Sequence, residues 1–198
     1  VREADWAKIL KVKLGREEAE DKRMINLIRS ISDKPIYVDA NQGWPTKEHA
    51  LMMCQWLAEQ GVVMIEQPMP KDMNEEHAWL CEQVDLPILA DEACQTYDDV
   101  ARLAPYYDGI NIKLMKCGGV AEGRKMIALA RELGMQVMIG CMTETSAGIS
   151  AATTLSPLVD YADLDGHVLI ANDPYEGIQI VDGKLTLVDK PGTGVSLR

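Results

Sequence analysis

The feature that most constrains the fold is a regular alternation of short apolar runs with amphipathic stretches of helical period. Near-continuous apolar strands that alternate with helices form parallel sheets with helices packed on their faces. The sequence therefore predicts an α/β protein. The runs interpreted as strands are Ile9–Lys13, Ile36–Asp39, Val62–Glu66, Ile88–Asp91, Gly109–Lys113, Gln136–Gly140 and Tyr161–Asp165.

The stretches between the strands show apolar residues at helical spacing. A helix over Glu17–Ile31 is predicted to bury Met24, Leu27, Ile28 and Ile31. A helix over Lys47–Gln60, with Thr46 as its N-cap, is predicted to bury Ala50, Met53, Cys54 and Leu57. His77 also lies in a helical stretch, where we expect it to be solvated.

The ends of the first five strands are evenly spaced, 22 to 27 residues apart. Even spacing without a glycine-rich phosphate loop after the first strand favours a TIM-like (β/α)7β barrel over a doubly wound sheet. Only seven strands are visible, so we expect the first barrel strand upstream of Val1. Residues 177–188 predict a hairpin that turns at Asp182-Gly183. We expect a partial barrel over 1–176, followed by a hairpin and tail over 177–198.

Composition excludes several classes of partner. The formal net charge of -11 disfavours nucleic acid and anionic membrane surfaces. No apolar stretch of about 18 residues suggests a membrane span. The five cysteines are widely spaced and form no CxxC pair, which favours reduced thiols in a cytoplasmic protein.

Ionisable residues close most of the predicted strands, and this pattern indicates a catalytic site. In a (β/α) barrel the catalytic groups come from the carboxyl ends of the strands. Those ends carry Lys13, Asp39, Glu66, Asp91, Lys113 and the pair Asp163 and Asp165. Three adjacent strands end in carboxylates, which would repel one another without a cation, and their hard oxygen ligands suit Mg²⁺.

The two lysines at strand ends lie on either side of the three carboxylates along the strand order, which suggests proton transfer. A cation that binds a substrate carboxylate stabilises the enolate formed when the neighbouring proton leaves. If Lys13 and Lys113 reach opposite faces of one carbon, one removes the proton and the other returns it, which inverts the configuration. Lys11 shares a strand face with Lys13 and adds positive charge there, and Asn41 and Glu92 are expected to orient the ligands or the lysines.

These residues resemble the enolase superfamily, in the subgroup around muconate-lactonizing enzyme. The matching segments are "KVKLG" at Lys11–Gly15, "VDANQGW" at Val38–Trp44, "IEQP" at Ile65–Pro68, "LADE" at Leu89–Glu92 and "NIKLMKCGG" at Asn111–Gly119. The resemblance implies that Lys13 and Lys113 form the acid/base pair and that Lys11 contacts the substrate carboxylate. It implies the magnesium ligands Asp39, Glu66 and Asp91.

Within this subgroup, "DLDG" at Asp163–Gly166 is similar to the DxD motif of dipeptide epimerases. The resemblance implies that Asp163 and Asp165 bind the α-ammonium group of a dipeptide such as L-Ala-D/L-Glu, whose C-terminal residue is epimerised. Family members also carry an N-terminal α+β capping domain, which this sequence lacks, so we expect a longer natural protein whose C-terminal tail packs toward that domain. The resemblance further suggests a homo-oligomer.

Two other functions remain open from the sequence. Muconate cycloisomerisation or o-succinylbenzoate synthesis could occur on the same scaffold, but those substrates carry no ammonium group for the acidic pair to bind. A non-catalytic binding barrel is the alternative from another class. It would be expected to have lost some of the metal ligands or lysines, and all of them are present.

Overall fold

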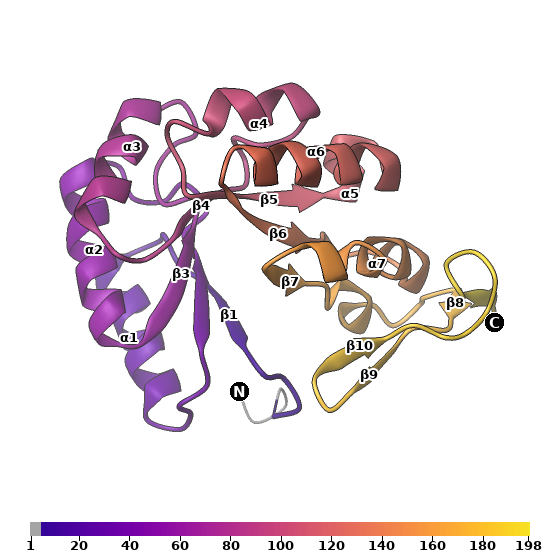
Figure 1. Ribbon diagram of the computed structural model, residues 1–198. Helices are drawn as coiled ribbons and strands as arrows, with labels where there is room; N and C mark the ends of the chain where they lie inside the picture. The colour runs from indigo at the N-terminus through magenta and orange to yellow at the C-terminus, as the bar shows by residue number, and fades with distance from the viewer. Residues whose placement is uncertain (1–4) are drawn as a thin grey trace. The chain divides into compact units, whose positions relative to one another are not determined.

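A computed structural model of the chain describes residues 5–198 and resolves two compact units (Figure 1). Of the described residues, unit 1 comprises those up to Cys94 and Arg102–Gly109, and unit 2 comprises Gln95–Ala101 and Ile110–Arg198. Helix α4 (Tyr97–Leu103) is divided between the two units. Each unit is described by itself below.

Unit 1 contains four adjacent parallel strands in sequence order. Helices α1 to α3 run along one side of these strands (Figure 1). The pairing places Lys13 opposite Asp39, and Asp39 opposite Glu66, so three predicted site residues occupy neighbouring positions. The elements are β1 (Leu10–Lys13), α1 (Glu18–Arg29), β2 (Ile36–Asp39), α2 (Lys47–Glu59), β3 (Val62–Glu66), α3 (Asn74–Gln83) and β4 (Ile88–Ala90).

The core of unit 1 confirms the predicted buried face of α2, because Ala50, Met53, Cys54 and Leu57 are fully buried. The Thr46 hydroxyl accepts a hydrogen bond from the backbone N–H of His49, as expected of an N-cap.

The predicted buried face of α1 is wrong, because Met24 and Leu27 are 42% and 65% exposed. The helix instead buries Asp21 and Ile25. The physical reason is a hydrogen bond. The Asp21 carboxylate accepts a hydrogen bond from the backbone N–H of Gly15 at 2.8 Å, and this bond turns the Asp21 side of the helix toward the loop after β1.

Unit 2 holds the next strands of the series and the C-terminal hairpins. Strands β5 (Gly109–Lys113), β6 (Gln136–Gly140) and β7 (Tyr161–Asp163) follow one another in the sheet order, and β6 and β7 pair in parallel. The helical elements are α5 (Leu114–Cys117), α6 (Val120–Glu132), α7 (Ser146–Thr153) and the 3₁₀ turns η1 (Ser156–Leu158) and η2 (Gly166–Leu169).

The C-terminal segment forms two antiparallel strand pairs. Strand β8 (Tyr175–Glu176) pairs with β11 (Ser196–Leu197), and β9 (Gln179–Val181) pairs with β10 (Lys184–Thr186). The β9–β10 turn has φ of 50° at Asp182 and 71° at Gly183, as a type I′ turn requires. The predicted hairpin is thus confirmed, and the domain boundary at 176 stays a prediction.

Two predicted strands end earlier than expected. Strand β4 ends at Ala90 and β7 ends at Asp163, so Asp91 and Asp165 lie just beyond the ladders. Within residues 5–198, none of the helices has the length and apolar character that a bilayer crossing needs.

Candidate metal centre and acid–base site

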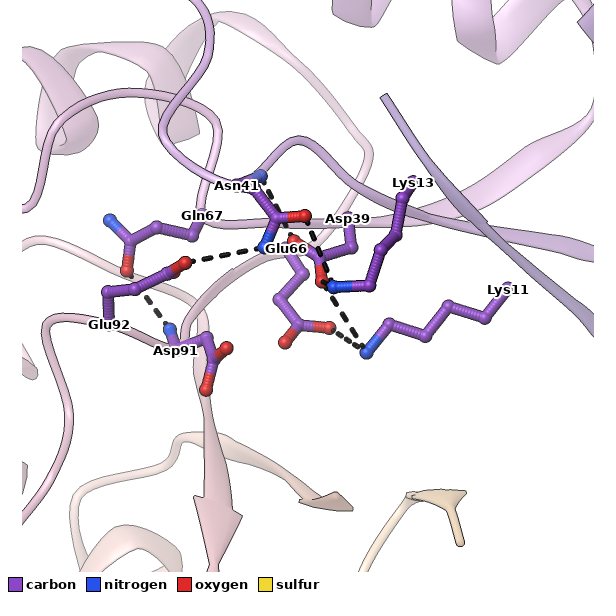
Figure 2. Close-up of polar contacts among 8 residues, drawn as sticks. All are labelled: Lys11, Lys13, Asp39, Asn41, Glu66, Gln67, Asp91 and Glu92. Carbon is purple, nitrogen blue, oxygen red and sulfur yellow. Dashed lines mark hydrogen bonds and ion pairs between the residues drawn. The ribbon is translucent and has the colours of Figure 1, made fainter. Parts of the chain in front are cut away.

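Three carboxylates from neighbouring strands of unit 1 converge at the carboxyl ends of those strands (Figure 2). One oxygen each of Asp39, Glu66 and Asp91 lies within 4.8 Å of the others, and all three side chains are buried. Asp39 and Glu66 are the last residues of β2 and β3, and Asp91 follows β4. The structure therefore brings the three predicted metal ligands together.

The two lysines of β1 reach the same carboxylates (Figure 2). The Nζ of Lys11 lies 2.7 Å from Oε2 of Glu66 and 3.9 Å from Oδ2 of Asp39. The Nζ of Lys13 lies 3.1 Å from the same Oδ2 atom of Asp39. Only 15% of the Lys11 side chain is exposed, whereas 71% of the Lys13 side chain is, so Lys11 is enclosed beside the carboxylates and Lys13 remains reachable from solvent.

Of the three carboxylates, Glu66 is the one whose ionisation the site makes unfavourable. Burial, together with the negative charges of Asp39 and Asp91, outweighs the attraction of Lys11 and raises the pKa of the Glu66 carboxyl to about 7. The protein thus holds Glu66 in an environment that disfavours its ionised form unless further positive charge is supplied.

Asn41 forms hydrogen bonds with both Lys13 and Glu92. Asn41 and Glu92 are the two residues that were expected to orient the ligands or the lysines. The Oδ1 of Asn41 accepts from Nζ of Lys13 at 3.2 Å, and its Nδ2 donates to Oε1 of Glu92 at 3.3 Å. The backbone N–H of Asn41 donates to Oδ1 of Asp39 at 3.0 Å, which helps to fix the orientation of that carboxylate. Asn41 adopts a left-handed φ of 45°, a conformation that asparagine tolerates better than most residues.

Backbone contacts hold the loop after β2 close to its neighbours. A Cβ added to Gly43 would lie 2.1 Å from the carbonyl oxygen of Gly15, so the two glycines permit a close approach of two chain segments. The backbone N–H of Ala40 donates to the carbonyl of Glu66, and that of Leu14 donates to the carbonyl of Asp39. These bonds extend the strand pairing beyond β1 and β2.

Sequence reasoning missed Gln67, which is fully buried directly after Glu66 and has a left-handed φ of 39°. Its side-chain oxygen accepts the backbone N–H of Asp91 (Figure 2). The sequence shows only that a polar residue stands between the predicted ligand Glu66 and Pro68. It does not show that this residue bonds the backbone of Asp91.

The remaining predicted residues lie in unit 2. Lys113 ends β5 and is only 7% exposed. Asp163 ends β7, and Asp165 follows at the start of η2. Burial, and then the charges of Asp163, Asp165 and Glu144, raise the pKa of the Cys141 thiol to about 12.

The donor set of unit 1 fits a hard divalent cation. All three candidate ligands are carboxylates, with no thiol or imidazole in the group, which suits Mg²⁺ rather than zinc or copper. When all three carboxylates are ionised, Lys11 and Lys13 supply two positive charges against three negative ones, so the cluster keeps a net negative charge that a cation would offset. Asp39, Glu66 and Asp91 could hold the ion.

The chain matches a known protein family and several curated proteins along nearly its whole length. The "Enolase C-terminal domain-like" family model matches residues 1–198. An L-Ala-D/L-Glu epimerase from Bacteroides thetaiotaomicron is 58% identical over 187 residues, which cover 94% of this chain and 48% of that protein. The chain therefore spans about half the length of the curated relatives that it matches.

Solved structures show the same fold. A dipeptide epimerase from Cytophaga hutchinsonii, complexed with Mg and the dipeptide D-Ala-L-Val, matches with a TM-score of 0.90 and 27% identity over 97% of this chain and 54% of that chain. A muconate cycloisomerase variant also matches with a TM-score of 0.90, at 26% identity over 100% of this chain and 57% of that chain. The predicted fold class, part of a TIM-like (β/α) barrel, is confirmed.

Proposed function

The chain belongs to the enolase C-terminal domain-like family, and from that premise we propose that it is the catalytic part of a magnesium-dependent dipeptide epimerase. The proposed reaction inverts the α-carbon of the dipeptide's C-terminal residue, with L-Ala-D/L-Glu or a related dipeptide as the substrate. The observation that carries the proposal is the buried carboxylate trio with Lys11 and Lys13 at its edge.

In this proposal Asp39, Glu66 and Asp91 hold Mg²⁺. The bound ion would supply positive charge that stabilises the negative charge developing on the substrate carboxylate. Lys11, enclosed beside Glu66, contributes a second positive charge and is proposed to contact the same carboxylate.

Lys13 and Lys113 are proposed to move the proton. Lys13 is suited to this role because its Nζ is held at 3.1 Å from Asp39 and 3.2 Å from Asn41 while the side chain stays accessible. Lys113 is a buried lysine at the end of β5, a position where catalytic groups of (β/α) barrels occur. One lysine takes the α-proton as a base, and the other donates a proton to the opposite face as an acid.

The acidic pair of unit 2 is proposed to select the substrate. Asp163 ends β7 and Asp165 follows two residues later, so two carboxylates lie next to each other in the chain at the end of this strand. A dipeptide carries an α-ammonium group whose charge complements such a site. Muconate and o-succinylbenzoate precursors carry no such group, so this observation favours the epimerase over reactions of other enzymes with the same fold.

Stereochemistry provides the test. Full-length protein with Mg²⁺ in deuterated buffer should incorporate deuterium at the α-carbon of L-Ala-L-Glu and interconvert its epimers, as measured by mass spectrometry and chiral separation. In Lys13→Ala and Lys113→Ala, interconversion should stop. Each variant should still exchange the α-proton of the one epimer that faces the remaining lysine, because each epimer presents its α-proton to only one of the two lysines.

Lys125→Ala is the matched control, because Lys125 is exposed and pairs only with its helical neighbour Glu122 in the described structure. The control should retain full activity. Unchanged interconversion in both strand variants would disprove the two-lysine assignment. Unchanged dipeptide affinity in Asp163→Ala and Asp165→Ala would instead favour a cycloisomerase-type substrate. Failure of the full-length protein to bind Mg²⁺ would favour a non-catalytic binding barrel.

A further inference from the structure

The contacts of Gln67 reach the loops of all three candidate metal ligands. It follows Glu66 directly in sequence. Its side-chain Oε1 accepts the backbone N–H groups of Asp91 at 3.0 Å and Ala93 at 3.1 Å. Its backbone carbonyl accepts the N–H of Gln42, in the loop that follows Asp39.

The orientation of the Gln67 amide is fixed by its partners. Two backbone N–H groups face Oε1, so that atom must be the acceptor. The two hydrogens of Nε2 go to the carbonyl of Met69 at 3.2 Å and to the hydroxyl oxygen of Tyr107 at 3.0 Å. All donors and acceptors of this fully buried amide are therefore satisfied.

The partner of Gln67 is itself anchored. Tyr107 is 4% exposed, and its ring centroid lies 4.5 Å from that of His77. The Nδ1 of His77 lies 2.7 Å from the carbonyl of Met73, so the imidazole donates there and its position is set by α3. A chain of contacts thus runs from His77 in α3 through Tyr107 and Gln67 to the backbone of Asp91.

The backbone of Asp91 needs this support because β4 ends at Ala90. Beyond that point the N–H groups of Asp91 and Ala93 are buried and obtain their hydrogen bonds from Gln67. Leaving a buried N–H without a partner is costly, so loss of the amide would displace the Asp91 loop. Asp39 and Glu66 are held by the strand pairing and would stay in place.

We propose that Gln67 is a positioning residue that sets the distance of the Asp91 carboxylate from Asp39 and Glu66, and hence the affinity for a divalent cation. This inference rests on the metal role proposed above and deepens it, because Gln67 would act on the ion through the backbone of the Asp91 loop. It also explains why glutamate would not substitute: a carboxylate lacks the two hydrogens that Met69 and Tyr107 accept, and would add a fourth negative charge beside the trio.

The test measures Mn²⁺ binding by electron paramagnetic resonance on the full-length protein. Gln67→Met keeps the length of the side chain and removes its four hydrogen bonds. Its dissociation constant for Mn²⁺ should rise about 10- to 100-fold, as is typical when a residue that orients a metal ligand is lost. Activity should recover at high Mg²⁺, so that the apparent constant for Mg²⁺ rises while kcat at saturation changes little.

Two controls separate positioning from general destabilisation. Leu57→Ala removes a fully buried side chain of α2 and should lower stability without changing the Mn²⁺ dissociation constant. Tyr107→Phe removes the hydroxyl that accepts one Nε2 hydrogen of Gln67 but leaves both bonds that Oε1 accepts, and should change the constant much less than Gln67→Met. If Gln67→Met does not fold, Gln67→Asn keeps the amide but is one methylene shorter, and should shift the constant in the same direction.

The inference is overturned if the folded Gln67 variant binds Mn²⁺ as tightly as the wild type, or if Leu57→Ala weakens binding equally. Its failure can be told apart from failure of the proposed function. Wild-type protein that binds Mn²⁺ without epimerising any dipeptide disproves the function, while the Gln67 comparison still supports positioning if the constant rises. Wild-type protein that binds no divalent cation overturns both.

Discussion

Replacing Glu66 with glutamine is expected to stabilise the metal-free protein while abolishing its affinity for a divalent cation. Burial, with the charges of Asp39 and Asp91, raises the pKa of Glu66 from 4.5 to about 7 despite the Lys11 ammonium. Between pH 4.5 and 7 the folded protein keeps a proton that the unfolded chain has released. Stability therefore falls as the pH rises through this window, and the cost is complete above pH 7.

The magnitude follows from the size of the shift. At about 1.4 kcal/mol per pKa unit, ionising Glu66 in the folded protein costs about 3 kcal/mol. Glutamine has the same shape and carries no charge. At pH 8 without metal, Glu66→Gln should be more stable than the wild type by about 1 to 3 kcal/mol, the lower value applying if Lys11 loses much of its stabilisation. At pH 5 the wild-type carboxyl is protonated in the folded protein, and the difference should largely disappear.

Urea unfolding in EDTA at pH 5 and pH 8 measures both values. Glu59→Gln, at an exposed position at the end of α2, serves as the control and should show no such difference. Adding Mg²⁺ at about 100 times its dissociation constant should stabilise the wild type by about 2.7 kcal/mol and leave Glu66→Gln unchanged. The reasoning is refuted if the variant is less stable at pH 8 in EDTA, if the difference is equal at both pH values, or if Mg²⁺ stabilises both proteins alike.

Two further predictions concern the surroundings of the trio. Burial lowers the pKa of His77 from 6.5 to about 4, so only the unfolded chain takes up a proton below pH 6.5. Stability is therefore complete above pH 6.5 and falls by about 2 kcal/mol from pH 7 to pH 5, and urea unfolding of His77→Gln should lack this loss. A Cβ at Gly15 would meet the carbonyl oxygen of Ala40 at 2.0 Å, so Gly15→Ala should cost about 2 kcal/mol or more and weaken Mn²⁺ binding. Gly134→Ala, also at positive φ but facing open space, should cost only about 1 kcal/mol and leave Mn²⁺ binding intact, and a similar loss of binding in both would contradict the steric argument.

The trio could be predicted from the sequence because its geometry depends on the backbone. Asp39 and Glu66 end adjacent parallel strands, and the register pairs these two residues directly, so any side chains at these positions would lie together. The same holds for Lys13, which pairs with Asp39. Strand periodicity and strand order suffice for this part of the site.

The contacts of Gln67, His77 and α1 could not be predicted from hydrophobic patterns. Those of Gln67 and His77 depend on Tyr107, which is distant in sequence, and that of α1 depends on a polar bond to a nearby loop. His77 was expected to be solvated, but Tyr107 covers its ring and it is fully buried. The buried face of α1 follows from the bond between Asp21 and the backbone of Gly15, and hydrophobic periodicity gives no weight to an aspartate. The helix is therefore rotated so that Asp21 forms its hydrogen bond, although this rotation leaves Leu27 exposed to solvent.

The three buried carboxylates destabilise the fold by repelling one another, whereas the contacts around them hold them together. Three buried carboxylates repel one another, and in isolation they would move apart or take up protons. Lys11 offsets part of the repulsion through its 2.7 Å contact with Glu66, but burial, together with the charges of Asp39 and Asp91, still raises the pKa of Glu66. Strand pairing and the Gln67 amide hold the ligands in place despite this cost, so a cation that binds there has little reorganisation to drive. The buried carboxylates therefore both lower the stability of the metal-free protein and provide its affinity for the ion. A substitution that removes one of these charges is expected to raise the stability of the metal-free protein and to weaken ion binding.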